Sequence, residues 1–292
     1  MREFSGKWAI VITALLWSTS GLSIKFLDWH PIIIAGGRSF FAAVFMIAVR
    51  LLFGSGGGAP LRRTLKTPAF WGAGLSYSAT MLLFVVANKL SSSANVILLQ
   101  YSAPVWTAIL AWIIIKEKPK PEHWGGMALV FAGFFVFFKD ALGNGTLSGD
   151  TLAVASGVAF AASSVFLRMM QDGNPADGLI CAHIISALFC IPFIILYPPQ
   201  PEMLNLKSAL TILYMGFVQI GAASLLYSYG MKKISAMSAM LIFPIEPILN
   251  PIWVLLVMNE IPPLQAIAGG AIIIFAVFAT NVVGIIRERR GE

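Results

Sequence analysis

The chain has 292 residues, of which 58% are hydrophobic and only 11% are charged. Typical globular chains carry about 45–50% apolar and about 25% charged residues, so a soluble protein of this length could not cover its surface with so few charges. The composition excludes a soluble enzyme, a fibrous protein and a disordered chain. The formal net charge of +7 fits either a nucleic-acid binder or a membrane protein whose basic residues gather at one face.

Long apolar stretches dominate the sequence. A membrane-spanning helix needs about 20 mostly apolar residues, because its backbone polar groups must be satisfied within the segment. Ten stretches meet this requirement, in chain order 8–26, 31–53, 69–88, 94–115, 122–138, 150–170, 177–197, 208–229, 235–257 and 263–285. The first is similar to a secretory signal, but its counterpart in the second half of the chain indicates that it is retained. We therefore predict an all-α integral membrane protein with ten transmembrane helices.

The basic residues lie mainly at one predicted membrane face. With ten spans, both termini and every second loop share a face, and fifteen of the twenty Lys and Arg residues fall there. The opposite face holds Lys25, Lys89, Lys139 and Lys207, while Arg38 lies inside a span. Because short cytoplasmic loops carry the excess of Lys and Arg, we predict a multi-pass protein of the cytoplasmic (inner) membrane with both termini cytoplasmic. The same distribution accounts for the net charge without a nucleic-acid partner.

The two halves of the chain match at a constant offset of 143 residues. The matched pairs are Gly6/Gly149, Ser20/Ser163, Lys25/Arg168, Lys89/Lys232, Pro104/Pro247, Glu117/Glu260, Pro119/Pro262 and Gly126/Gly269. This pattern indicates a duplication, with one five-helix repeat at 1–142 and a second at 143–292. Because five spans is an odd number, the second copy enters the membrane from the opposite side. We therefore predict inverted-topology repeats, a construction that many secondary transporters share.

Several short motifs accompany this duplication. They are Ala14-Leu-Leu-Trp17, Arg38, Ala103-Pro-Val105, Lys116-Glu-Lys-Pro119, Ile245-Glu-Pro247 and Asn259-Glu-Ile-Pro262. With them the chain resembles, over essentially its whole length, the EamA-type branch of the drug/metabolite transporter superfamily, whose halves end in a similar Glu-Pro … Gly-Glu … Gly pattern. The resemblance implies a ten-helix transporter of small metabolites, often an exporter of amino acids, with a cavity lined by spans one, three, four, six, eight and nine. The chain departs from the pattern at Lys116 and Asn259, where Gly is usual, and at Phe160, where Trp is common.

Two charged residues lie deep within predicted spans. A charge there costs at least about 2.5–3.5 kcal/mol, so each is a candidate functional residue. Glu246 directly precedes Pro247, and proline removes a helix hydrogen bond and can open the helix. Its carboxylate could bind an ammonium group, take a proton or act as a structural tether. Arg38 could hold a substrate carboxylate, pair with Glu246 or have a structural role.

Polar and aromatic side chains cluster in the same spans. The candidate substrate-binding residues are Trp17, Ser20, Tyr77, Gln100, Tyr101, Ser163, Tyr227, Phe243, Glu246 and Asn250. Surfaces of this kind suit aromatic, amphipathic or amine-bearing solutes, although aromatic residues also fill helix interfaces. His183 is either a proton relay or a packing residue, and Cys181 and Cys190 are expected to be inert thiols.

Motifs for metal binding, nucleophilic catalysis, phosphate binding and dinucleotide binding are not found in the sequence. We therefore predict no metal, no cofactor and no enzyme activity. The favoured function is secondary transport of small metabolites by alternating access, with amino acids or related amphipathic compounds exported by a monomer or homodimer. The driving force is either a proton gradient or the solute gradient. The alternatives are uptake or exchange of a quaternary amine, nucleobase or sugar-linked compound, and a multispan membrane enzyme.

Overall fold

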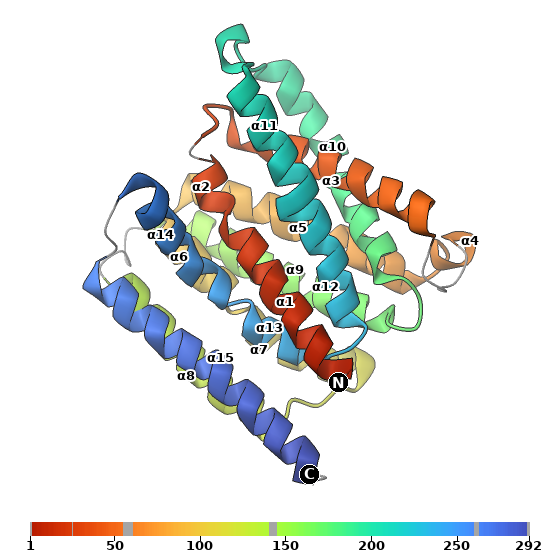
Figure 1. The fold of residues 1–292 in the computed structure, drawn as a ribbon, viewed down its shortest axis with the longest axis vertical. Coiled ribbons are helices and arrows are strands. Elements are labelled where there is room, and N and C mark those ends of the chain that lie inside the picture. The colour runs from red at the N-terminus through yellow and green to blue at the C-terminus, as the bar shows by residue number, and fades with distance from the viewer. Residues whose placement is uncertain (1, 25, 55–60, 140–144, 260–262, 291–292) are drawn as a thin grey trace.

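The computed structural model describes residues 2–24, 26–54, 61–139, 145–259 and 263–290, and its elements are all helical (Figure 1). The first half contains α1 (Arg2–Ser18), α2 (Ser20–Ile24), α3 (Pro31–Phe53), α4 (Leu61–Thr64), α5 (Pro68–Leu90), α6 (Ser93–Gln100), α7 (Ala103–Leu110), a π-helical turn (Ala111–Ile115) and α8 (Pro121–Phe138). The second half contains α9 (Leu147–Met169), α10 (Pro175–Leu196), a 3₁₀ turn (Pro201–Met203), α11 (Leu206–Tyr214), a π-helical segment (Met215–Ala222), α12 (Ala223–Met231), α13 (Ala236–Ile242), α14 (Ile245–Met258) and α15 (Leu264–Arg290).

Nine helical segments of the described chain are long and apolar enough to cross a membrane. They match nine of the ten predicted spans. The tenth, predicted at 122–138, is helical as α8 but is not among these nine segments. The all-helical membrane fold is therefore confirmed, while the crossing by α8 stays a prediction.

Local sequence signals set where several of these helices begin. α3, α5, α8 and α10 each begin at a proline. Proline has no N–H, and this costs nothing at the first helical position because an N–H there would have no acceptor within the helix. Before α5, the Thr67 hydroxyl accepts a hydrogen bond from the Phe70 N–H, and Thr146 does the same for Gly149 before α9. Such caps satisfy backbone donors that the first turn leaves free.

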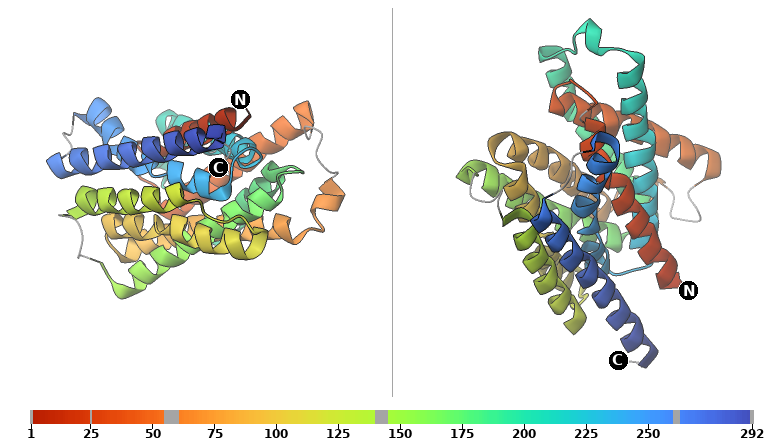
Figure 2. Two further views of the ribbon diagram at one scale, coloured as in Figure 1. Left: turned by 90° about the horizontal axis from the view of Figure 1, so that it is seen from below. Right: turned by 60° about the vertical axis from the view of Figure 1, so that its left-hand side comes forward.

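Corresponding helices of the two halves run antiparallel to each other. Between α8 and α15, Gly126 lies against Thr280 and Gly133 lies against Ile273, so the numbering rises along one helix as it falls along the other. Figure 2 shows these two helices side by side. α3 and α10 pair in the same sense, because Arg50 near the end of α3 forms an ion pair with Asp177 near the start of α10. A helix runs antiparallel to its own counterpart when the second repeat is inverted, as the sequence predicts. The predicted boundary between residues 142 and 143 lies outside the described residues.

The first helix of each half packs against the third and fourth helices of the other half. α1 contacts α12, α13 and α14, and α9 contacts α5, α6 and α7. Both fourth spans are interrupted in the middle, between α6 and α7 and between α13 and α14. The interruptions lie just before the equivalent prolines Pro104 and Pro247, because a proline disrupts the hydrogen bonding of the preceding turn. These broken helices and the two first helices surround the centre of the molecule.

Candidate functional site

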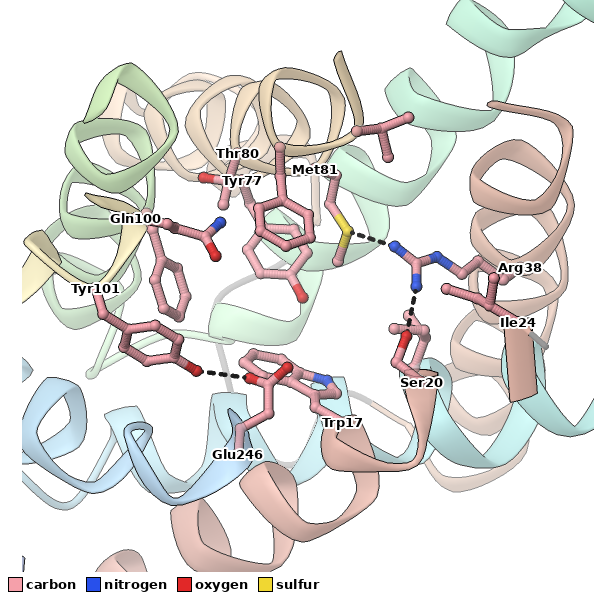
Figure 3. Close-up of a pocket in the computed structure, with 14 residues that line it drawn as sticks. Trp17, Ser20, Ile24, Arg38, Tyr77, Thr80, Met81, Gln100, Tyr101 and Glu246 are labelled. Carbon is pink, nitrogen blue, oxygen red and sulfur yellow. Dashed lines mark hydrogen bonds between the residues drawn. The ribbon is translucent and has the colours of Figure 1, made fainter. Parts of the chain in front are cut away.

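A cavity lies at this centre (Figure 3). Its volume is about 160 Å³, which is below the range of about 300–1,000 Å³ for drug-sized sites and suits a smaller ligand. The lining residues are Trp17, Ser20, Ile24, Arg38, Tyr77, Thr80, Met81, Phe84, Val85, Gln100, Tyr101, Phe160, Ile220 and Glu246. Of these lining residues, Ile24 is exposed to solvent, whereas Trp17 and Tyr77 are buried. The mouth of the cavity is therefore at the Ile24 end of the bundle.

Arg38 reaches the cavity from α3. Its Nη1 donates to the Ser20 hydroxyl at 3.3 Å and its Nη2 to the Met81 sulfur at 3.4 Å, while its Nε is buried without an acceptor. Both partners are neutral, and no carboxylate of the described residues forms an ion pair with the guanidinium. A buried cation without a counter-ion is costly, and this arrangement favours a role in binding an anionic group.

Glu246 reaches the cavity from the first turn of α14. Its Oε2 accepts a hydrogen bond from the Tyr101 hydroxyl at 3.1 Å. The break after α13 positions the carboxylate, since the Glu246 N–H donates to the Phe243 carbonyl at 2.8 Å rather than continuing a longer helix. Within the described chain, Arg38 and Glu246 do not form an ion pair with each other, and Figure 3 shows them facing the cavity from different sides.

Stacked aromatic rings close the cavity opposite its mouth. Trp17 stacks on Phe243 with ring centres 5.0 Å apart and an interplanar angle of 14°, and its ring meets Tyr227 edge-on at 5.7 Å. Phe160 and Tyr77 lie 6.2 Å and 6.4 Å from Trp17. We call these five residues the aromatic floor. The Trp17 Nε1 group is buried without an acceptor, so the floor also presents a free donor.

The structure brings most of the predicted site residues together. Those that line the cavity are Trp17, Ser20, Arg38, Tyr77, Gln100, Tyr101 and Glu246. Tyr227 and Phe243 are fully buried behind Trp17. Ser163 is also buried, and its hydroxyl donates to the Phe160 carbonyl. Asn250 lies in α14, but its side chain is outside the described part of the structure.

The sequence prediction missed the apolar part of the lining. Met81 and Val85 follow Tyr77 at intervals of four residues on α5, and residues so spaced share one helix face. That spacing from a predicted site residue is the signal that could have identified them. Ile24 and Ile220 carry no such signal, because isoleucine is common on every face of a membrane helix.

His183 lies near the cavity without lining it. Its Nε2 is 3.0 Å from the Ser224 hydroxyl, and its ring meets Tyr77 edge-on at 5.6 Å. Cys181 and Cys190 are free and buried. The described residues include no group of three or more His, Cys, Asp and Glu side chains that could hold a metal ion.

Comparisons with known proteins agree with this architecture. The model of the EamA-like transporter family matches twice, over residues 4–139 and 147–282. Two relatives are the uncharacterized transporter YwfM of Bacillus subtilis, 24% identical over 57% of each chain, and human solute carrier family 35 member G1, 28% identical over 56% of this chain and 48% of that protein. The chain thus spans about half the length of these relatives. A solved crystal structure shares the fold, with a TM-score of 0.81 and 19% identity over 96% of this chain and 98% of the other.

These observations together define a multi-pass helical membrane protein that is built from two repeats. The chain belongs to the EamA-like transporter family, whose model covers both halves.

Proposed function

We propose that this transporter moves small zwitterionic metabolites, amino acids above all, out of the cell through the central cavity. The observation that carries the proposal is the presence of two opposite charges, Arg38 and Glu246, in one cavity without an ion pair between them. A solute with both a carboxylate and an ammonium group supplies a counter-ion to each. Its binding would bury no unbalanced charge, which is the main cost of a charged site in a membrane.

The aromatic floor supports an amphipathic solute. Trp17 and Tyr77 offer ring faces between the two charged ends, and such faces favour apolar groups and cations. The buried Trp17 Nε1 donor can satisfy an oxygen of the substrate. A neutral sugar-linked compound would leave both charges unbalanced.

We further propose alternating access between two inverted repeats, at 1–142 and 143–292. The excess of Lys and Arg at the face that holds the termini favours cytoplasmic termini. In that orientation the Ile24 mouth is on the outer side, and the aromatic floor separates the cavity from the cytoplasm. The reciprocal packing of α1 and α9 lets one repeat rock against the other to reverse this arrangement. Either a proton taken up by Glu246 or the solute gradient drives the cycle, and the unit is a monomer or homodimer.

The test uses the purified protein in liposomes, with radiolabelled amino acids, amines and simple carboxylates, and with or without a pH gradient. The wild type is expected to prefer the zwitterions. Arg38→Gln should lose the transport of amino acids and keep the transport of amines. Glu246→Gln should lose the transport of amino acids and keep the transport of carboxylates. Lys207→Gln, which lies outside the cavity, is the matched control. Equal transport of amino acids by both cavity variants and the wild type would refute the proposal, and preferred transport of amines by the wild type would favour a quaternary-amine carrier.

A further inference from the structure

A second, polar pocket lies at the end of the bundle that holds the N-terminus, among α1, α8, α13 and α15. Its volume is about 20 Å³, enough for one group the size of a water molecule or an ammonium. The lining residues are Lys7, Lys120, Glu122, His123, Ser238, Leu241, Thr280, Asn281 and Gly284. We call it the headgroup pocket. It is separate from the central cavity, because the two share no lining residue.

An apolar groove continues from this pocket along the outside of the bundle. Its volume is about 330 Å³, and it is lined by side chains that include Trp8, Val11, Ile245, Ile274 and Phe278. Lys7 and Asn281 line both the groove and the headgroup pocket. The headgroup pocket at the membrane face therefore adjoins an apolar groove that faces the hydrocarbon of the membrane.

In the headgroup pocket, one carboxylate oxygen of Glu122 has no hydrogen-bond donor. Its side chain is only 2% exposed, and its Oε2 accepts a hydrogen bond from Arg287 at 3.1 Å. Its Oε1 is buried and has no donor. A buried carboxylate oxygen without a hydrogen bond loses its hydration and gains nothing in return. The pocket is therefore built for a ligand that brings an N–H or O–H donor to Glu122.

We propose that the headgroup pocket and the groove bind one molecule of phosphatidylethanolamine. An acyl chain lies in the groove, the phosphate lies at the junction beside Lys7 and Asn281, and the primary ammonium donates to Glu122 Oε1. The order of apolar, cationic and anionic groups along the site matches the order of acyl chain, phosphate and ammonium along this lipid. Basic pockets between helices at a membrane face bind lipid phosphates in this way.

The donor requirement separates phosphatidylethanolamine from other phospholipids. The quaternary ammonium of phosphatidylcholine has no N–H, so it cannot satisfy Glu122 Oε1. Phosphatidylglycerol has no cation, and its hydroxyl groups form weaker hydrogen bonds to a carboxylate than an ammonium does. The site should therefore prefer the primary amine.

The first experiment varies the lipid and leaves the protein unchanged. Native mass spectrometry of the purified full chain, titrated with phosphatidylethanolamine and its mono-, di- and trimethylated forms, should show affinity falling as N–H donors are removed, by about tenfold in total for a lost hydrogen bond to a charged group. Equal affinity across the series, preference for phosphatidylglycerol, or a protein dimer in place of bound lipid would overturn the proposal.

The second experiment locates the lipid on the protein. Glu122→Gln should abolish the preference for the primary amine, and Lys7→Gln should weaken the binding of every phospholipid. Lys66→Gln, at an exposed Lys outside the pocket, should change neither the preference nor the affinity. Ile274→Trp should fill the groove and reduce lipid binding at least tenfold. Ile267→Trp, at an exposed isoleucine of the same helix outside the groove, is its matched control. Unchanged binding by Ile274→Trp would place the lipid elsewhere.

Discussion

The hydroxyl of Tyr101 lies 3.1 Å from Glu246 Oε2 and 3.3 Å from the Phe243 carbonyl. Tyr101 follows the last residue of α6 in the first repeat, and Glu246 is in the first turn of α14 in the second. One side chain thus joins the interruptions of both fourth helices at the cavity wall. Rocking of the repeats would change this contact, because its two members belong to different halves.

Tyr101→Phe removes the donor and keeps the ring. We expect the apparent affinity for a zwitterionic substrate to fall by about tenfold, because a hydrogen bond to a charged group contributes about 1.5–3 kcal/mol. Transport in proteoliposomes measures this effect. Tyr214→Phe is the matched control, since the Tyr214 hydroxyl contacts Thr19 outside the cavity. Equal losses in both variants would show that the Tyr101 contact has no special part in binding.

A second contact joins the repeats at the end of the bundle that holds the N-terminus. Arg168 Nε donates to Glu117 Oε1 at 2.7 Å, and Arg168 Nη1 donates to the Met231 carbonyl at 3.1 Å. Glu117 Oε2 accepts from the Ala236 N–H at 3.4 Å. The pair therefore ties the segment after α7 to the ends of α9, α12 and α13.

We expect a coupling energy of about 1 kcal/mol between Glu117 and Arg168, because the pair is partly buried and is held by backbone groups. A double-mutant cycle with Glu117→Gln and Arg168→Gln, followed by unfolding in detergent, measures it. Arg62→Gln, at an exposed Arg on the same side, should show no coupling with Glu117→Gln. Strictly additive losses for Glu117 and Arg168 would contradict the expected coupling.

Most of the fold could be predicted from the sequence because its signals are long and repeated. Runs of about 20 apolar residues indicate spans directly, and the 143-residue offset indicates the duplication. The cavity was harder to predict. Phe243 and Tyr101 both lie beside a helix interruption, yet Tyr101 lines the cavity while Phe243 lies one layer behind Trp17. Helix rotation and depth decide this difference, and neither is set by residue type.

Two of the three departures from the usual family pattern, Lys116 and Asn259, share one unfavourable backbone conformation. Lys116 and Asn259 adopt the left-handed conformation, with φ values of 60° and 57°, and they occupy equivalent positions after the fourth helices. This conformation costs a residue with a side chain about 1–2 kcal/mol, with less for Asn. Glycine, which the resemblance implies as usual at both positions, avoids the cost.

Lys116→Gly should therefore raise the free energy of unfolding by about 1 kcal/mol, and Asn259→Gly should raise it by less. Thermal and denaturant unfolding of the purified protein measure both changes. Lys118→Gly, two residues further on and without positive φ, should give no gain. A loss of stability in Lys116→Gly would mean that contacts of the Lys116 side chain outweigh the backbone cost.

The antiparallel packing of α8 and α15 depends on Gly269. A Cβ atom at Gly269 would collide with the backbone of Phe137 and Gly133, whereas one at Gly125 on α8 would meet open space. Backbone atoms of a packed helix cannot move aside as a flexible side chain can, so Gly269→Ala should lower the free energy of unfolding by about 1–3 kcal/mol. Gly125→Ala should be neutral or stabilising by about 0.5–1 kcal/mol, because alanine favours the helix. Unfolding curves of the two variants decide the matter: equal stabilities would mean that the two helices do not approach each other at Gly269, and the close pairing of the repeats would then need another explanation.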